Sequence, residues 1–159
     1  MNKKHTFELR EALLEFCRKK NWTNPQAVTL TLRTSRPAGI VRVKLTEVEA
    51  QQNLRHFLNV VHKKLAAYGF PKKAELLCVP IFEGNDAVRP HIHLMLDRPA
   101  CIEAAEYASL LEDEWSCTHW GHQRADVKPC DDEDGWLDYI SKLRTKTDYA
   151  AAIDWTNFT

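Results

Sequence analysis

Two histidines one residue apart are the residues of this chain with the clearest chemical potential. They lie in the run Pro90–Leu96, which is otherwise apolar and predicts a β-strand. Because side chains alternate between the two faces of a strand, His91 and His93 share one face while Ile92 faces the core. Two imidazoles on one face of a buried strand indicate a metal site.

A carboxylate is expected beside these histidines. If the connection between two strands is centred on Ala87, Glu83 pairs with His91 and lies on the same face. Two imidazoles and one carboxylate can bind Mg²⁺ or Mn²⁺ and leave positions open for phosphate oxygens and water. A bulge near Pro80 would break this register, and the histidines would then be ordinary polar residues of a strand.

A tyrosine with two lysines forms a second group near the end of the sequence. The spacing predicts a helix from Trp136 to about Lys146, with Tyr139, Lys142 and Lys146 on one flank. If this flank faces a metal, the tyrosine is suited to attack a phosphodiester while the lysines stabilise its phenolate. Taken alone, the pattern is better explained by an ordinary surface tyrosine with lysines beside it. The rival tyrosines are Tyr68, Tyr107 and Tyr149.

The elements that must position these residues follow from hydrophobic periodicity. Helices are expected at 6–20, 46–68, 99–115 and 136–146, and strands at 27–33, 74–83, 89–97 and 122–128. Residues 34–45 are expected as a loop with a short extra strand at 40–45. From residue 27 this order is the split βαβ, ferredoxin-like pattern, an α+β fold. It predicts an antiparallel central sheet with helices mainly on one face and extra helices towards both termini.

Length and composition indicate one globular domain over residues 1–159. The chain is 44% apolar and 28% charged, and no apolar run approaches the roughly 20 residues of a membrane span. The polar start predicts no signal peptide. Five cysteines without a CxxC pair favour a reducing cytoplasm over a disulfide framework.

Charge is unevenly distributed although the net charge is zero. Residues 1–73 carry 15 Lys/Arg and 5 Asp/Glu, and residues 74–159 carry 7 and 17. One interpretation is a basic face that meets phosphates, and the other is that the two halves mix in space. The residues expected to contact DNA are Arg33, Arg36, Arg42, Lys44 and Lys146, with Trp120 stacking on a base.

Three motifs, taken in order, resemble those of the HUH endonucleases, specifically the replication-initiator (Rep) class of rolling-circle replicons. Ala27–Arg33 looks like the first motif, a strand of the central sheet. Pro90–Leu94 is similar to the His-hydrophobic-His motif, and Tyr139–Lys142 to the Tyr-x-x-Lys motif. The resemblance covers roughly residues 27–146, and the ordered trio is more specific than any one motif.

The resemblance implies a metal-dependent enzyme that nicks and joins single-stranded DNA at a specific sequence. Tyr139 would attack the DNA and become joined to its 5′-phosphate. Lys142 would orient metal-bound groups or stabilise charge in the transition state. His91, His93 and Glu83 would hold Mg²⁺ or Mn²⁺. The expected partners are single-stranded or hairpin origin DNA of a plasmid or phage and a host helicase, without a membrane.

Other functions compete with this one. Conjugative relaxases fit less well, because they usually carry an N-terminal tyrosine and a third histidine, whereas single-tyrosine HUH transposases remain close rivals. A non-catalytic nucleic-acid-binding module of the same fold would need exposed aromatic residues on the sheet, but the first strand offers Thr29, Thr31 and Arg33. A structural zinc site is a minor alternative, built from the irregularly spaced Cys117, His119, His122 and Cys130.

Overall fold

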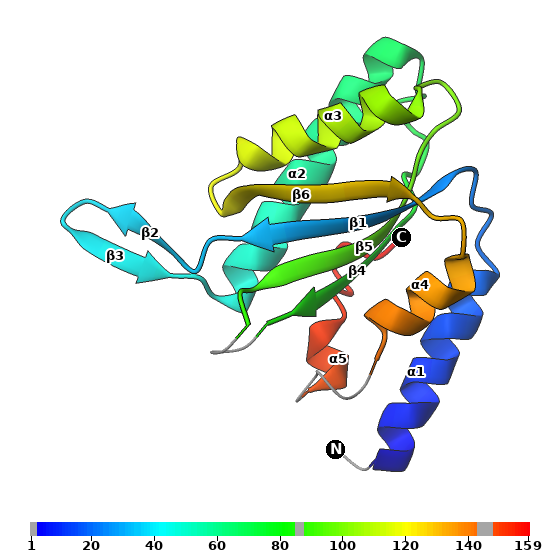
Figure 1. Cartoon of the computed structure of the whole chain (residues 1–159), viewed down its shortest axis with the longest axis horizontal. Helices are drawn as coiled ribbons and strands as arrows, with labels where there is room; N and C mark the ends of the chain where they lie inside the picture. Colours follow the sequence, from blue (N-terminus) through cyan, green and yellow to red (C-terminus); the bar gives the residue numbers. More distant parts are fainter. Residues whose placement is uncertain (1–2, 85–87, 143–147) are drawn as a thin grey trace.

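The computed structural model describes residues 3–84, 88–142 and 148–159 and has an α+β architecture (Figure 1). Its centre is a four-stranded antiparallel sheet in the order β4-β5-β1-β6. These strands are β1 (Pro25–Leu32), β4 (Cys78–Glu83), β5 (His91–Asp97) and β6 (Gly121–Pro129). The helices are α1 (Lys3–Arg18), α2 (Glu47–Leu65), α3 (Ala104–Ser116), α4 (Glu133–Ile140) and α5 (Tyr149–Ala152), with a 3₁₀ turn, η1 (Ala66–Tyr68), after α2.

One face of the sheet carries the larger core and is covered by α2 and α3 (Figure 1). Alternate residues of β1 supply it, and Val28, Leu30 and Leu32 are each at most 1% exposed. The predicted capping box begins α2, because the Thr46 side chain accepts from the Glu49 N–H while the Glu49 carboxylate accepts from the Thr46 N–H. The helices on this face therefore hold β1 and β5 in place.

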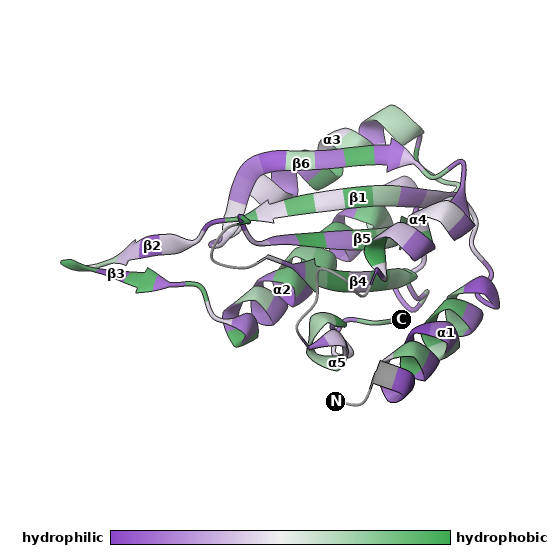
Figure 2. Cartoon of the chain, turned by 60° about the horizontal axis from the view of Figure 1, so that its bottom comes forward, coloured by the Kyte–Doolittle hydropathy of each residue, from purple (hydrophilic) through white to green (hydrophobic). Residues whose placement is uncertain are grey.

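The opposite face is also covered, in part, which differs from the expectation of helices mainly on one face. α1, α4 and α5 pack there against β4 and β5 in a second apolar cluster. The physical reason is that Val79, Ile81 and Met95 point to that face and are fully buried. Figure 2 shows α1 and α5 beyond β4, and α4 beside β5.

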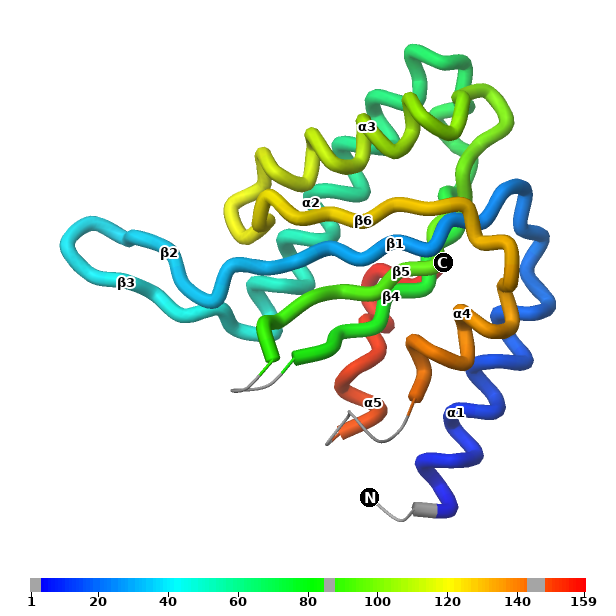
Figure 3. Tube along the Cα trace, in the orientation of Figure 1, coloured from blue at the N-terminus to red at the C-terminus, as the bar shows by residue number. Residues whose placement is uncertain are grey.

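The edge strand β4 is protected by the end of the chain, which runs back beside it (Figure 3). The Thr159 N–H donates to the Cys78 carbonyl at 3.0 Å, and the Asp154 N–H donates to the Pro80 carbonyl at 3.1 Å. Pro80 accordingly sits on an edge strand, as expected of a residue that cannot donate to the ladder. No register shift interrupts β4 and β5 between Cys78 and Glu83.

Several segments differ from their expected bounds or types: β4 begins at Cys78 and not at residue 74, and α3 begins at Ala104 and not at residue 99. The predicted loop at 34–45 is a complete hairpin, β2 (Ser35–Ala38) with β3 (Val41–Lys44), so the extra strand was right and its partner was missed. α4 ends at Ile140, earlier than Lys146, and α5 was not predicted. No helix of the described residues is long and apolar enough to span a membrane.

Candidate metal and nucleophile site

The hairpin of β4 and β5 brings the three predicted metal ligands together. Glu83 pairs directly with His91, as the sequence predicts, and His93 follows on the same face. Gly84, directly after β4, has φ of 151°, and a Cβ added there would lie 2.6 Å from the Pro90 Cα. Glycine is therefore required where the two strands approach, and this close approach helps to fix the register.

Partners at the two Nδ1 atoms orient the imidazole rings, so that their Nε2 atoms face one another. His91 Nδ1 lies 2.9 Å from the Arg89 carbonyl, which can only accept, so Nδ1 carries the proton and a neutral His91 leaves the Nε2 lone pair exposed. The Thr29 hydroxyl lies 3.0 Å from His93 Nδ1. The two Nε2 atoms are 3.1 Å apart, a separation that needs either a shared proton or a cation.

Glu83 completes this group and links it to Lys142. One carboxylate oxygen lies 3.6 Å from His93 Nε2 and the other 3.2 Å from Lys142 Nζ. The Glu83 side chain is only 11% exposed, and the ligand atoms of Glu83, His91 and His93 all lie within 4.8 Å of one another. Among the residues that the structure describes, no other set of three His, Cys, Asp or Glu side chains meets this criterion, the proposed zinc residues included.

The donor set passes a simple fit test for a divalent ion. Two ligands of one ion lie about 3 Å apart when the bonds are about 2.1 Å long and meet at right angles. The 3.1 Å between the histidine nitrogens matches this spacing. Two imidazoles with one carboxylate suit several divalent metals, Mn²⁺ among them.

Tyr139 lies beside this triad on α4. Its ring packs edge-on against His93, with centroids 5.5 Å apart, and stacks on Trp136 at the same distance. Lys142 Nζ lies 4.1 Å from the centre of the Tyr139 ring. The side chain of Tyr139 is 48% exposed, so a substrate can reach it. The predicted flank of tyrosine and lysine is therefore present, although Lys142 lies beyond the helix cap at Ser141.

The rival tyrosines are placed elsewhere. Tyr107 is fully buried, and its hydroxyl donates to the Asp97 carbonyl at 2.9 Å. Tyr149 is 1% exposed, and burial raises its pKa to about 12. Tyr68 is an exposed residue of η1. Among the ring contacts of the described residues, Tyr139 is the one tyrosine that contacts a triad histidine.

Trp136 packs against the second apolar cluster, as its place on the helix predicts, but its contacts in the site were not indicated by the sequence. Its indole N–H donates to the Leu94 carbonyl at 3.0 Å, and its ring contacts both His93 and Tyr139. Its position four residues before Ile140 indicated burial, but nothing in the sequence indicated the two ring contacts.

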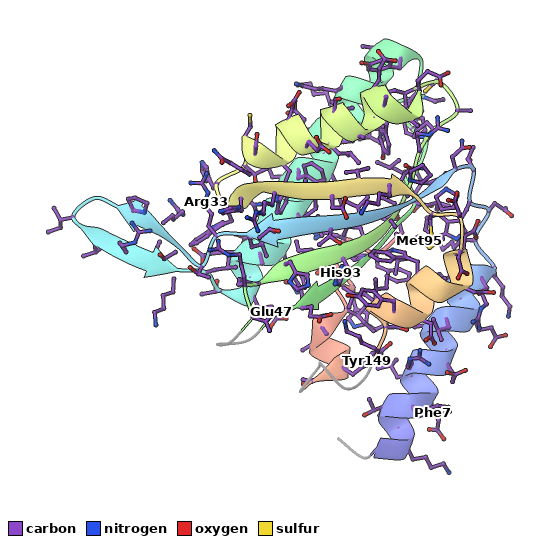
Figure 4. All side chains as sticks on the ribbon, in the orientation of Figure 1. Phe7, Arg33, Glu47, His93, Met95 and Tyr149 are labelled. Carbon is purple, nitrogen blue, oxygen red and sulfur yellow. The ribbon has the colours of Figure 1, made fainter. Side chains whose placement is uncertain are left out.

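The predicted DNA contacts divide into three groups. Arg33 lies at the hairpin end of β1 (Figure 4), and the other three basic residues of this segment, Arg36, Arg42 and Lys44, belong to β2 and β3. Lys146 lies outside the described residues. Trp120 is misassigned as a stacking residue.

Trp120 is 3% exposed because its backbone N–H donates to the buried Asn53 side chain at 3.1 Å, while Arg36 covers its ring. The loop is thereby tied to α2, and the indole belongs to the core. A polar asparagine on the buried stripe of α2 was the signal for this anchor.

Two further arginines that the sequence did not indicate lie at the same end of the sheet. Arg89 precedes β5 by two residues, and Arg124 lies on β6. Desolvation and the nearby charges of Arg89, Arg124 and Arg33 lower the pKa of His122. A cluster of positive charge therefore stands near the start of β5, where His91 lies.

A cleft of about 700 Å³ adjoins the triad. Glu83 and His91 line one part of it, and Lys44 and Thr46 line another, so it connects the metal site with the base of the β2–β3 hairpin and the start of α2. A cleft of this size can accommodate a small-molecule or nucleotide-sized ligand.

No family model, no curated protein and no solved structure matches this chain. A functional assignment therefore depends on the residues and their arrangement.

Proposed function

We propose that this protein is a metal-dependent DNA nicking and joining enzyme of the HUH type with one catalytic tyrosine, Tyr139. The observation that carries the proposal is the meeting of Glu83, His91 and His93 on one sheet face, with the Tyr139 ring 5.5 Å from the His93 ring. A metal-binding donor set and an accessible oxygen nucleophile are the two parts that this chemistry requires.

The topology supports the proposal. The strand order β4-β5-β1-β6, with α2 between β1 and β4 and α3 between β5 and β6, agrees with the ferredoxin-like split βαβ arrangement that we propose for this domain. In that arrangement the histidine strand is internal, flanked by β1 and β4. The fold alone does not define a function, so the argument depends on the site.

The proposed reaction is a phosphoryl transfer in two steps. The Tyr139 oxygen attacks the phosphorus while its phenolic proton is lost to solvent. A phosphotyrosine ester forms in which the phosphorus stays bonded to the 5′ oxygen, and the bond from phosphorus to the 3′ oxygen breaks. The departing 3′ oxygen takes a proton and becomes a 3′-OH. When bound, a divalent ion would act as a Lewis acid on the phosphate oxygens. In the reverse step a 3′ oxygen, losing its proton, attacks the phosphorus. The bond from phosphorus to the Tyr139 oxygen breaks and the tyrosine takes up a proton, so strands are joined without ATP.

Lys142 has two roles in this proposal. Its ammonium group contacts Glu83 at 3.2 Å and lies over the Tyr139 ring, so it both orients the carboxylate and stabilises negative charge that develops on the tyrosine oxygen. Lys142 holds the Glu83 carboxylate facing His93, so that Glu83 is in place as a metal ligand. Together they keep the nucleophile next to the metal ligands.

The proposed setting is initiation of rolling-circle replication of a plasmid or phage in a cytoplasm, with a host helicase as partner. A single-tyrosine transposase would perform the same chemistry on transposon ends, so both settings share the test below. A non-catalytic binding module would bind DNA without forming a covalent bond.

The test is covalent capture of DNA. A pool of random single-stranded DNA labelled at the 3′ end is incubated with the protein and Mn²⁺ and resolved on a denaturing gel. We expect labelled DNA to migrate with the protein, because the tyrosine retains the 5′-phosphate of the downstream fragment. A 5′ label should instead appear on a shortened strand with an extendable 3′-OH.

Tyr139→Phe should abolish the adduct, whereas Tyr68→Phe, which alters an exposed tyrosine away from the triad, should retain it. EDTA should prevent adduct formation. If wild-type protein binds the pool but gives no adduct with Mn²⁺ or Mg²⁺, the enzyme proposal fails and the binding module remains.

A further inference from the structure

The β2–β3 hairpin projects away from the body of the molecule (Figures 1 and 2). Val43 and Leu45 pack its base against the main core. Its tip carries Ile40, which is 105% exposed, and Val41, which is 58% exposed. Such a two-stranded ribbon gains little stability by itself, and an apolar tip in water gains none from burial. The tip is therefore suited to contact another molecule.

All the charged residues of the hairpin are basic. Residues 33–45 contain four basic residues and no acidic one. Within the described part of the chain no ion pair includes Arg33, Arg36, Arg42 or Lys44, whereas other basic residues of the same half do pair with carboxylates. Arg42 and Arg33 donate instead to neutral oxygens of Ser35 and Gly121, which leave the positive charge uncompensated.

The cationic face of the hairpin ends at the cleft beside the metal site, where Lys44 lies with the carboxylates of Glu47 and Asp148. Ser35 pairs with Lys44 and Pro37 with Arg42, so both cations lie on one face of the ribbon. Lys44 also lines the cleft that reaches Glu83 and His91. A polyanion lying along this face would thus be led towards the triad.

We propose that the β2–β3 hairpin binds double-stranded DNA flanking the nicking site, a proposal that rests on the proposed function. A two-stranded β-ribbon fits a DNA groove, where Arg42 and Lys44 would reach phosphates and Ile40 would contact base edges or a base step. Single-stranded DNA is the weaker candidate for this surface, because residues 33–45 contain no aromatic side chain on which bases could stack.

A membrane surface is also a weaker candidate. The apolar tip has two aliphatic residues and lacks the tryptophan or tyrosine typical of interfacial anchors. The cationic face moreover leads into the cleft that Glu83 and His91 line. The experiment therefore includes phosphatidylserine vesicles as the competing ligand.

The test measures equilibrium binding in EDTA, so that neither metal nor nicking is needed. The probe is a fluorescein-labelled hairpin duplex of about 20 base pairs in about 50 mM salt, followed by anisotropy. We expect the double variant Arg42→Gln/Lys44→Gln to bind about tenfold more weakly and to lower the salt-dependence slope by about 2. The matched control, Lys72→Gln/Lys73→Gln, removes two exposed charges that lie outside the hairpin. It should change the affinity less than about twofold.

Ile40→Ser leaves the charge unchanged and should weaken duplex binding about threefold through the lost apolar contact. Equal losses in the two double variants, or vesicle binding without measurable duplex binding, would overturn the proposal. Absence of the covalent adduct with hairpin-dependent duplex binding intact would refute the enzyme and leave the binding surface standing, so the two failures can be told apart.

Discussion

At the scale of single residues, the carboxylate of Glu83 contacts two side chains of the site, Lys142 and His93. One oxygen faces Lys142 at 3.2 Å, and the other faces His93 at 3.6 Å. A metal ion held by the histidines would gain the second oxygen while Lys142 keeps the first. The site therefore has a carboxylate already oriented for an ion, which lowers the cost of ordering it on binding.

Glu83→Gln should consequently weaken Mn²⁺ binding by at least about tenfold, because an amide oxygen carries no net charge to attract the ion. The measurement is a titration followed by the electron paramagnetic resonance of free Mn²⁺. Glu112→Gln, an exposed change on α3, serves as the control and should leave the affinity unchanged. Equal affinity in wild type and Glu83→Gln would exclude this carboxylate as a ligand.

Trp136 provides a second prediction, as a positioning residue for the nucleophile. Its ring stacks on Tyr139 and contacts His93, so Trp136→Leu should slow adduct formation about tenfold through a misplaced tyrosine, while the affinity for single-stranded DNA changes less. Trp136→Phe retains an aromatic ring and should recover most of the rate. Single-turnover kinetics at saturating DNA separate the rate from the affinity, and equal rates in both variants would contradict the positioning role.

Much of the site was predictable from local rules. The strand alternation of His91 and His93 and the hairpin pairing of Glu83 need only a two-residue period and a turn centre, and both are confirmed. The ring contacts of Trp136 were not predictable, because they depend on how α4 docks on the sheet. The burial of Trp120 depends on its anchor to α2, for which Asn53 was the one signal in the sequence. Spacing along one element does not contain that information.

At the scale of elements, the N-terminal cap of α2 stabilises a helix that packs against the sheet face opposite His91 and His93. Thr46 and Glu49 satisfy one another's backbone N–H groups. Thr46→Ala should therefore lower the free energy of unfolding by about 1 kcal/mol. Urea unfolding followed by circular dichroism measures this change, with Ser109→Ala on the exposed face of α3 as the control. A change below a few tenths of a kcal/mol would mean that the cap is dispensable.

Charge at the end of the sheet gives a prediction about pH. Desolvation and the guanidinium groups of Arg89, Arg124 and Arg33 lower the pKa of His122. Nuclear magnetic resonance should show His122 titrating below the ordinary value of about 6.5, and Arg124→Gln should raise its pKa. Because the folded-state pKa is lowered, this histidine's contribution to stability is complete above about pH 6.5 and is lost as the pH falls through the folded-state pKa.

The elements also show where periodicity is insufficient. A loop assignment for residues 34–45 followed from Pro37 and Gly39, yet Gly39, with φ of 63°, is the turn that joins β2 to β3. α4 likewise ends early, at Ile140, because the backbone of the cap residue Ser141 (φ −89°, ψ 5°) departs from helical geometry. Turn residues were recognised, but not the pairing on either side of them.

At the scale of the whole molecule, the two oppositely charged halves of the sequence mix in part. Arg10 pairs with Asp138, Arg18 with Asp134 and Lys64 with Glu114 across the halves. The first two pairs join α1 to α4 and so help to hold the nucleophile helix in place. Arg36, Arg42 and Lys44 of the β2–β3 hairpin are among the basic residues of the described chain that form no such pair, which leaves positive charge where the proposed DNA enters.

The arrangement of two apolar clusters on opposite sheet faces predicts which cysteines react. All five are free thiols, and burial raises the pKa of Cys17 to about 12 and that of Cys78 further. Cys101 and Cys117 are exposed and should be labelled first by a disulfide-exchange reagent at neutral pH, followed slowly by Cys130, whose pKa is raised to about 11 by partial burial and acidic neighbours. Mass spectrometry of peptides identifies the sites, and denatured protein, which should be labelled at all five, is the control. Fast labelling of Cys17, which packs with Leu13 and Leu14 in the cluster on the metal-site face, would show that α1 does not cover that face in solution.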